Sequence, residues 1–445
     1  MIQGTQTDYS NLKAGYLANA SRNYTNVANA GTFNVNVNNT AANSNANIGA
    51  RTKLESNFVL RVLASWQNIG VDICDSRVKV HLEISDNNKP ILESGFLKRY
   101  GNLYETIYDY DNLVLAHHNA RKGKGWYKEV VEIDKDPDGY LLKLQDMLKS
   151  KTYRTSEYHE FERNDNGKTR TIYKLPYYPD RVCQWAILQI IEPIFQKKLI
   201  YDTYSAIPGK GIHLGVTRLQ KALQNKHETK YCLKYDIRKY YPSIDQDILK
   251  QQMRTIFKDP DLLWLLDEII DSVNSGIPIG NYLSQWFGNL YLTVMDRFVK
   301  EQLKIKYYFR YMDDVIILLD NKRELHTIRS GIEDMIERKL NLKLKSNYQI
   351  FPTRVRGIDF VGYRFFGNHI RLRKSIATRL KRAIRAVIKY IECFGEIVHK
   401  HWCMINSYRG WLKWCDGAVF THKHIYPMES YCDSYYKEVI KYGKF

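Results

Sequence analysis

The sequence predicts an α+β protein, because helical periodicities alternate irregularly along it with short apolar runs typical of strands. Helical patterns occur near residues 140–150, 182–196 and 260–274, and strand-like runs at residues 231–237 and 305–319. The chain has 445 residues, 44% of them hydrophobic and 26% charged, which is the composition of a folded globular protein. This composition argues against a mainly disordered or membrane-embedded chain, and the length allows about three domain-sized units.

The charge balance favours a polyanionic partner. The 67 Lys and Arg against 48 Asp and Glu give a formal net charge of +19, which attracts nucleic acid or an acidic membrane surface. The uncharged stretch at residues 272–295 is interrupted by Asn, Gln and Ser side chains, so we expect no transmembrane span and no membrane partner. Seven scattered cysteines without a CxxC pair predict reduced thiols, and the first residues lack a signal-peptide pattern, so we expect a cytoplasmic protein.

The first 96 residues differ in composition from the rest of the chain. Residues 19–47 hold eleven asparagines in 29 positions and almost no charged side chains. Asparagine competes for local backbone hydrogen bonds and disfavours helix interiors, so this clustering favours a poorly ordered, loop-rich leader. From about residue 97 the chain becomes charged, aromatic and strongly patterned, and we expect the folded body to begin there.

Two adjacent carboxylates interrupt the apolar run YYFRYMDDVIILL. The flanking residues predict a strand, turn and strand with Asp313 and Asp314 at the tip. An ordinary acidic turn faces water, but acids at the tip of an apolar hairpin lose hydration unless a cation or a donor compensates them. Asp236 ends a second apolar strand, YCLKYDI, 77 residues before Asp313. Three acids at strand ends favour a shared cation site over three unrelated turns.

This set of acids suits phosphoryl transfer. Joining a 3′-hydroxyl to a nucleoside triphosphate uses two divalent ions about 4 Å apart, and Mg²⁺ prefers oxygen ligands. We expect Asp236 and Asp313 to bridge two Mg²⁺ ions, for which Mn²⁺ is a substitute. Asp314 stands alongside, and the carbonyl of Ile237 is a candidate backbone ligand.

The Tyr-Met-Asp-Asp hairpin, preceded by an upstream Asp with following aromatic residues, resembles the palm of reverse transcriptases. The resemblance implies a right-hand polymerase fold with fingers (97–230), palm (231–366, with fingers elements interleaved), and a helical thumb with a C-terminal tail (367–445). It also implies RNA-directed DNA synthesis from dNTPs on a template RNA, with an RNA–DNA hybrid as product. By the same resemblance Tyr241, five residues after Asp236, matches the aromatic gate under the incoming sugar; core packing is its alternative role.

Further segments resemble this family in the expected order. Lys168 and Arg170 in NGKTRTIYK match the fingers cations that bind triphosphate oxygens, and a solvated hairpin is their alternative. Lys210, Gly211 and His213 in YSAIPGKGIH stand where reverse transcriptases approach the template, and glycine permits close backbone contact.

The segments after the palm match the parts of the family that hold the primer. Gly362 and Tyr363 in GIDFVGYRF resemble the hairpin that grips the primer end, although an ordinary core hairpin has similar residues. Eight basic side chains and no acid occur between residues 371 and 389, and the apolar residues of 377–391 recur at helical spacing. We expect this helix to follow a phosphate backbone, with a merely solvated face as the alternative. The candidate template and primer contacts here are Arg371, Arg373, Lys374, Arg379 and Arg382.

The segment GIPIGNYLSQWFGNLYL indicates a subclass. Most prokaryotic relatives carry Gln-Gly-x-x-x-Ser-Pro where this chain has Ile279-Gly280-x-x-x-Ser284-Gln285, and this departure resembles the reverse transcriptases of diversity-generating retroelements. We expect Ile279, Gly280 and Gln285 to contact the nucleotide; simple packing is the alternative for Ile279. The resemblance implies copying of a template-repeat RNA with misincorporation at adenines, replacement of a variable repeat in a target gene, and a small basic accessory protein as partner.

This subclass gives the leader a second interpretation. Asparagine codons begin with two adenines, and GTFNVNVNNTAANSNANIGARTKL resembles the translation of a template repeat. We therefore expect residues 1–54 to be read-through of template-repeat nucleotides, residues 55–96 to be read-through of the spacer, and translation to start near Leu97. A folded accessory domain is the alternative.

Two other functions fit the same motifs. The nearest is another prokaryotic reverse transcriptase, of the retron, abortive-infection or group II intron type. The alternative from a different class is a non-catalytic RNA-binding module. Loss of a carboxylate would favour that module, but Asp236, Asp313 and Asp314 are all present.

Overall fold

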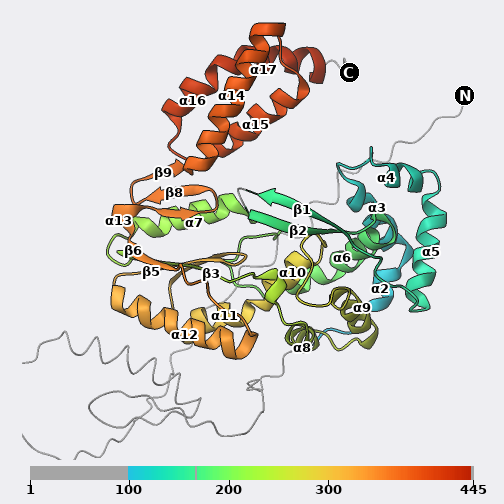
Figure 1. Ribbon diagram of the computed structural model, residues 1–445. Coiled ribbons are helices and arrows are strands. Elements are labelled where there is room, and N and C mark those ends of the chain that lie inside the picture. Colours follow the sequence, from blue (N-terminus) through green and yellow to red (C-terminus); the bar gives the residue numbers. More distant parts are fainter. Residues whose placement is uncertain (1–98, 166–167, 442–445) are drawn as a thin grey trace, which may run out of the picture. The chain divides into compact units, whose positions relative to one another are not determined.

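The structure is a computed structural model, and it describes residues 99–165 and 168–441 (Figure 1). The leader predicted over residues 1–96 lies outside the described residues. Within the described ranges helices and strands alternate irregularly, which confirms the α+β class predicted from the sequence. None of the helices in these ranges is both long and apolar enough to span a bilayer.

Helices and one β-hairpin form the first part of the described chain. The elements are α2 (Tyr104–Tyr108), α3 (Tyr110–Arg121), α4 (Lys128–Ile133), α5 (Pro137–Lys149), β1 (His159–Asp165), β2 (Lys168–Lys174), the π-helical turn η1 (Tyr177–Arg181) and α6 (Val182–Gln196). Asp109 and Asp136 begin α3 and α5, because their carboxylates accept hydrogen bonds from backbone N–H groups of the first turn. α3 packs against α6, and β1 pairs antiparallel with β2.

A four-stranded antiparallel sheet lies at the centre of this body. Its order is β4–β5–β3–β6, so the β4–β5 hairpin pairs with a strand from an earlier part of the chain. The elements here are α7 (Ile212–Gln224), β3 (Tyr231–Asp236), η2 (Tyr241–Ser243), α8 (Gln246–Ile256), α9 (Pro260–Ile270), α10 (Ser284–Tyr291), α11 (Thr293–Arg297), η3 (Phe298–Gln302), β4 (Tyr307–Tyr311), β5 (Asp314–Leu319), α12 (Lys322–Leu340) and β6 (Gln349–Pro352).

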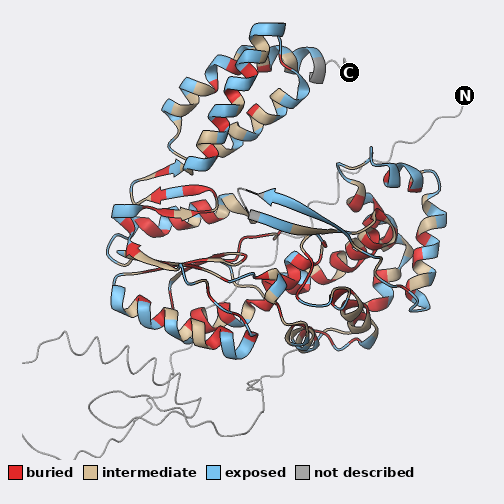
Figure 2. Cartoon of the chain, in the orientation of Figure 1, coloured by how far each residue is buried: buried red, intermediate tan, exposed pale blue. Residues whose placement is uncertain are grey.

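Both faces of this sheet are covered. Residues 315–318 of β5 are fully buried on alternate faces, which is why the strand is apolar throughout rather than alternating. On one face Leu219 and Leu223 of α7 pack into a cluster with Phe309 of β4, and on the other α12 contacts β3, β5 and β6. Figure 2 shows this buried layer between the exposed outer faces of the helices.

A small sheet and a helical bundle complete the described chain. The elements are α13 (Thr353–Arg356), β7 (Ile358–Phe360), β8 (Tyr363–Phe366), β9 (His369–Leu372), α14 (Lys374–Phe394), α15 (His399–Leu412), α16 (Ala418–His424), η4 (Tyr426–Met428), α17 (Glu429–Tyr435) and η5 (Tyr436–Lys441). Leu380, Ile384 and Val387 form the buried stripe of α14 and pack against Ile405 of α15. The basic amphipathic helix predicted over residues 377–391 is therefore confirmed, with additional turns.

One predicted helix is shorter than its apolar pattern. The pattern extends over residues 260–274, but α9 ends at Ile270. The carboxamide of Gln246 explains this, because its Nε2 donates to the carbonyls of Ile270, Val273 and Gly276 and so satisfies them outside a helix. The other predicted helices and strands differ from the structure only by a few residues at their ends.

Candidate active site

The three predicted carboxylates meet at one edge of the four-stranded sheet. Asp236 is the last residue of β3 and lies opposite Asp314, the first residue of β5. Asp313 occupies the turn between β4 and β5, and it lies close enough to Asp236 for their carboxyl groups to interact. Antiparallel pairing of β3 with β5 produces this convergence, because it places the end of one strand beside the start of the other.

A lysine neutralises each of the two strand-end acids. The Lys234 ammonium lies 3.1 Å from Asp314 Oδ2 and also donates to the carbonyl of Asp359 at 2.5 Å. The Lys345 ammonium pairs with Asp236. Residues 234 and 236 lie on the same face of β3, since side chains alternate along a strand. The two-residue spacing in the sequence is therefore a signal that could have identified Lys234 as a neighbour of the site. The position of Lys345, 109 residues after Asp236, carried no such signal.

Burial and mutual repulsion act on these carboxyl groups. Burial raises the pKa of Asp313, and the neighbouring Asp236 raises it further. Burial also raises the pKa of Asp314 to about 6, against the opposing effect of the Lys234 ammonium. Carboxylates in such an arrangement are stabilised by an added cation.

The residues present fit a divalent cation. Oδ1 of Asp236 and Oδ1 of Asp314 are both buried and have no hydrogen-bond partner, so each acid keeps one free oxygen at the site. The donors are all oxygens, as Mg²⁺ requires. Within residues 99–165 and 168–441, no group of three or more His, Cys, Asp or Glu side chains has the spacing of a metal site. Instead, Lys234 pairs with Oδ2 of Asp314 and Lys345 pairs with Oδ2 of Asp236.

The backbone beside Asp236 leaves one carbonyl available. The chain after β3 pairs with residues 343–345 through hydrogen bonds from Arg238 N to Lys343 O and from Lys345 N to Asp236 O. Ile237 lies between these two bonds, opposite Leu344. Its carbonyl takes part in neither of them, which is compatible with the backbone ligand predicted from the sequence.

Tyr241 lies between the acids and the β1–β2 hairpin. Its hydroxyl is 3.6 Å from the sulfur of Met312, the residue before Asp313. Burial raises the pKa of the Tyr241 phenol, Asp313 raises it further, and the Arg170 guanidinium acts in the opposite direction. The phenol is therefore within electrostatic range of both Asp313 and Arg170. Lys168 begins β2, two residues before Arg170.

The Ile-Gly segment connects Tyr241 to the same hairpin. Ile277 N donates to the carbonyl of Tyr241 at 3.0 Å, and Tyr173 N of β2 donates to the carbonyl of Ile279 at 2.8 Å. Gly280 has a φ of +125°, and a Cβ there would lie 2.3 Å from the carbonyl oxygen of Tyr173, so only glycine fits. Gln285, in the first turn of α10, has an exposed side chain.

A buried arginine that sequence analysis missed supports the acidic turn. Arg310 and Asp296 are both fully buried, and the guanidinium donates to the carboxylate at 2.6 and 2.7 Å. Arg310 also donates to the carbonyls of Met312 and Asn289. Its place two residues before Met312 in a strand was visible, but only the fold reveals that its side chain faces the core.

The predicted template loop is held by contacts within the protein. The Lys210 ammonium donates to the carbonyl of Tyr201 at 2.7 Å and lies over the Tyr201 ring. Gly211 precedes α7 with a φ of +123°. His213 is exposed on one side and stacks on Trp414, with ring centroids 4.5 Å apart. The Lys210 ammonium is thus engaged by contacts within its own loop, whereas the face of the His213 ring opposite Trp414 is exposed.

The structure favours the alternative role, core packing, for one side chain of the predicted primer grip. Tyr363 is fully buried, and its hydroxyl donates to the carbonyl of Trp411 at 2.9 Å, so it packs as an ordinary core residue. Gly362 has a φ of +92°, and a Cβ there would lie 2.5 Å from the Trp411 ring. The backbone of this turn, whose Gly362 carbonyl accepts from Arg373 N, closes the small sheet onto α15.

The basic residues around α14 are not equivalent. Arg373 pairs with Asp359, and Arg371 lies over the Phe366 ring at 5.4 Å. Lys374, Arg379 and Arg382 are exposed and form no ion pair among the described residues. These three remain available to a phosphate backbone.

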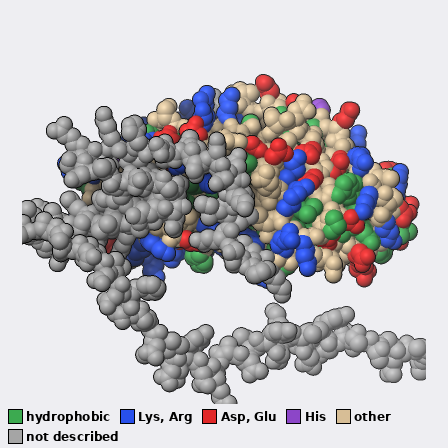
Figure 3. Space-filling model, turned by 90° about the horizontal axis from the view of Figure 1, so that it is seen from below, with side chains coloured by type: hydrophobic (Ala, Val, Ile, Leu, Met, Phe, Trp, Pro, Cys, Tyr) green, Lys and Arg blue, Asp and Glu red, His purple; other side chains and the backbone are tan. Residues whose placement is uncertain are grey.

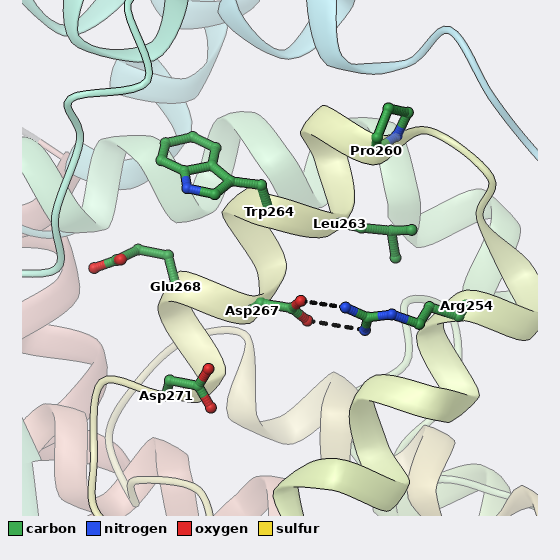
Figure 4. A pocket seen from close by; sticks show the side chains of 7 residues that line it. All are labelled: Arg254, Pro260, Leu263, Trp264, Asp267, Glu268 and Asp271. Carbon is green, nitrogen blue, oxygen red and sulfur yellow. Dashed lines mark hydrogen bonds and ion pairs between the residues drawn. The ribbon is translucent and has the colours of Figure 1, made fainter.

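One cavity lies away from the three acids. It has a volume of about 490 Å³ and lies between α8 and α9, where the Arg254 guanidinium pairs with Asp267 (Figure 4). Glu268 and Asp271 also line it, so its charge disfavours phosphate. On the face seen in Figure 3, basic and acidic side chains are interspersed wherever side-chain types are drawn.

Comparisons with known proteins agree with this geometry. Residues 161–365 match the family model described as reverse transcriptase (RNA-dependent DNA polymerase). Protein YkfC of Escherichia coli (strain K12) is 22% identical over 286 residues, which cover 52% of this chain and 75% of that protein. The group II intron-encoded protein LtrA of Lactococcus lactis subsp. cremoris is 23% identical over 239 residues, 50% of this chain and 38% of LtrA.

Solved structures that resemble the chain include two telomerases. Apo telomerase from Candida tropicalis has a TM-score of 0.41 and 14% identity over 56% of this chain and 51% of that one. Telomerase from Candida albicans, in complex with a fragment of telomeric RNA, has a TM-score of 0.39 and 11% identity over 54% and 52%. This chain thus spans about half of the telomerase chains and 38% of LtrA. Residues 161–365 therefore match a reverse transcriptase (RNA-dependent DNA polymerase) domain within a chain of the α+β class.

Proposed function

We propose that the protein copies a template-repeat RNA into cDNA that carries mutations at adenines, and that this cDNA diversifies a target gene by mutagenic retrohoming. The observation that carries the catalytic part is the convergence of Asp236, Asp313 and Asp314, two of which keep a buried, unpartnered oxygen. A non-catalytic RNA-binding module would not require these acids to stay together, because their mutual repulsion only destabilises it.

Asp236 and Asp313, with the carbonyl of Ile237 and with Asp314 alongside, would hold the two Mg²⁺ ions. When bound, the ions supply activation of the attacking 3′-oxygen and charge stabilisation of the leaving pyrophosphate. Before the ions bind, the Lys234 and Lys345 ammonium groups would offset the negative charge of Asp314 and Asp236. Asp236 and Asp314 lie opposite each other at strand ends of one sheet, so backbone pairing fixes their separation, and Asp313 lies in the turn directly before Asp314.

The residues around the acids would orient the dNTP. Arg170 and Lys168, from β2, would bind triphosphate oxygens, with the Arg fork giving bidentate contacts. Tyr241 would lie under the sugar, and its ring would leave no room for a 2′-hydroxyl. Fingers, palm and thumb would span residues 97–230, 231–366 and 367–445.

The thumb would hold the RNA–DNA hybrid through the exposed side chains of Lys374, Arg379 and Arg382 on α14 and its start. Cations on one helix face follow a phosphate backbone without reading its sequence. His213, exposed beside α7, is a further candidate for template contact. A small basic accessory protein and the structured template RNA are the expected partners.

Two sequence features support a diversity-generating retroelement over other reverse transcriptases. One is Ile279-Gly280-x-x-x-Ser284-Gln285, and the other is the asparagine-rich stretch at residues 19–47, whose codons contain the adenines that such elements mutate. Similarity to LtrA favours a second candidate, a reverse transcriptase of the group II intron type, which would copy adenines faithfully.

Primer extension on an RNA template tests the proposal. We expect Mg²⁺-dependent cDNA that Asp313→Ala abolishes, with errors concentrated opposite template adenines. Synthesis with evenly distributed errors would favour the second candidate. No synthesis under any priming condition would overturn the catalytic proposal. Sequencing of the flanking DNA adds an independent test, because a near-copy of the asparagine codons that differs only at adenines is expected nearby.

A further inference from the structure

A small cavity lies at the end of the fingers hairpin, away from the acids. Its volume is about 90 Å³, and its wall includes Lys124, Lys174, Arg181, Gln184 and Gly280. Sites for drug-sized ligands usually measure about 300–1,000 Å³, so this one accommodates a group of the size of a phosphate rather than a nucleoside.

The charges around the cavity are positive and partly uncompensated. Three cations and one carboxylate, Glu129, line it, which leaves a formal charge of +2. Glu129 is already engaged, since it accepts from Tyr177 N at 2.6 Å and lies 3.7 Å from Lys174. Lys124 and Arg181 have no carboxylate partner among the described residues. Burial and the neighbouring Arg181 lower the pKa of Lys124, as expected for cations held together without an anion.

Two donors in the wall also have no partner. Gln184 is 2% exposed, and its Oε1 accepts from Tyr282 N at 2.9 Å, but its Nε2 is buried without an acceptor. The Nε of Arg181 is likewise buried and unpartnered, while the guanidinium stacks over the Tyr282 ring at 5.5 Å. Buried donors without acceptors are rare, and together with two free cations they define a site for an anionic oxygen group.

The position of the cavity relates it to the polymerase site. Arg170, Ile172 and Lys174 project from the same face of β2, because side chains alternate along a strand. Arg170 lies near Tyr241, and Lys174 lines the cavity, four residues or roughly 13 Å further along. Gly280 lines the cavity from the segment that also bonds to Tyr241. A strand that leaves the active site along this face would reach the cavity within a few nucleotides.

Aromatic side chains at the rim suit unpaired bases. Trp126 is 77% exposed and Tyr127 37% exposed, and their rings are 4.4 Å apart. The loop that carries them also carries Lys122 and Lys124. Aromatic rings beside a positive groove are the usual features of a site for single-stranded nucleic acid.

We propose that this cavity binds a backbone phosphate of the unpaired template strand ahead of the active site, with Trp126 stacking on an adjacent base. The inference rests on the proposed RNA-directed polymerase function and adds a template contact on the fingers. Phosphodiester and free phosphate share the same chemistry, so the test must separate these two sources.

Template–primer binding by the full chain gives the test. Fluorescence anisotropy without divalent ions would compare an RNA–DNA duplex that has a 5′ template overhang with a blunt one. We expect Arg181→Gln and Lys124→Gln to weaken binding of the overhang duplex by roughly tenfold, to leave the blunt duplex unchanged, and to reduce the salt slope by about 1. Lys143→Gln, at an exposed position of α5, is the matched control.

Two further variants separate the aromatic stack from the guanidinium fork. Trp126→Ala, which removes an exposed side chain and should fold normally, is expected to reduce overhang binding at least about fivefold. Arg181→Lys should recover part of the affinity, since it restores the charge but not the fork. An overhang preference unchanged in Arg181→Gln and in Trp126→Ala would overturn the proposal.

Inorganic phosphate separates the two sources. If phosphate alone raises the melting temperature of the wild-type chain but not of Arg181→Gln, and the overhang preference is the same in both, the cavity takes free phosphate and the template assignment is wrong. These binding measurements need no cDNA synthesis. A chain that binds overhangs as expected but makes no cDNA would contradict the proposed function and not this inference.

Discussion

The guanidinium of Arg310 donates to the carbonyl of Met312 at 3.0 Å, so a fully buried cation holds the turn that presents Asp313. Met312 has a φ of +57°, a left-handed conformation that costs a residue with a side chain about 1–2 kcal/mol. Arg310 is anchored by Asp296 and also donates to the carbonyl of Asn289. The turn is therefore fixed from the core, and the position of the half-buried acids depends on residues that lie behind them in the core.

Loss of Arg310 should destabilise the whole domain. Arg310→Met leaves the buried carboxylate of Asp296 without a partner, and removal of one member of a buried ion pair typically costs about 3–5 kcal/mol. Urea denaturation should show this decrease in the free energy of unfolding. The double variant Arg310→Met, Asp296→Leu should recover part of it, because no buried charge is then left alone. A single variant as stable as the wild type would contradict the assigned network.

Arg310→Lys separates positioning from folding. The ammonium can keep the pair with Asp296, but it cannot also reach Met312 and Asn289 in a fixed fork. We expect a lower kcat for cDNA synthesis and a higher Mg²⁺ requirement, with the KM for dNTP little changed, in protein that melts near the wild-type temperature. A change in KM alone would show that the arginine does not act through the turn.

Removal of one acid should stabilise the metal-free protein while it abolishes synthesis. Asp313 is half-buried and lies close to Asp236, so Asp313→Asn relieves charge repulsion. The expected gain in the free energy of unfolding is about 1–2 kcal/mol in the absence of divalent ions. It is smaller than for a fully buried pair of acids, because the site is partly open to solvent, which screens the repulsion. Thermal melting with and without Mg²⁺ measures it.

The same experiment gives a second readout of ion binding. Mg²⁺ should raise the melting temperature of the wild-type chain, since a ligand that binds only the folded state stabilises it. The rise should be smaller in Asp313→Asn. An equal rise in both proteins would place the ion elsewhere.

Tyr241→Ala should admit ribonucleotides. The Tyr241 hydroxyl contacts the sulfur of Met312, and its backbone carbonyl accepts a hydrogen bond from Ile277 N, so both the ring and the backbone are held close to Asp313. We expect discrimination between dNTP and rNTP to fall roughly 10- to 100-fold in single-nucleotide incorporation. Tyr241→Phe is the control and should keep its discrimination, because the ring and not the hydroxyl excludes the 2′-hydroxyl. If Tyr241 only packs, both variants should discriminate as the wild type does.

Local patterns were sufficient to predict the acids and most element positions. Asp236 and Asp313 stand at the ends of apolar runs, and such runs form strands whose ends are local features of the sequence. The partners of the acids were not predictable in the same way. Lys345 and Asp296 come from elements whose approach depends on the tertiary fold. The same reason explains Tyr363, because an aromatic residue in a hairpin looks alike whether it faces a primer or the core.

The segment at Ile279 gives the sharpest test of mutagenic copying. Its backbone is fixed on both sides, because Tyr173 N binds the carbonyl of Ile279 and the neighbouring Gly280 fits against the Tyr173 carbonyl only without a Cβ. The side chain itself is only half-buried, so a polar replacement can be accommodated without loss of the core. An amide there would add a donor and an acceptor beside the nucleotide site and restrain the template base or the incoming dNTP.

We expect Ile279→Gln to lower misincorporation opposite template adenine by several-fold, with errors at other bases little changed, as measured by sequencing of cDNA. Ile279→Val, which keeps the apolar surface, should retain the wild-type errors. An identical error spectrum in the Gln variant would show that Ile279 only packs and that the source of infidelity lies in other residues.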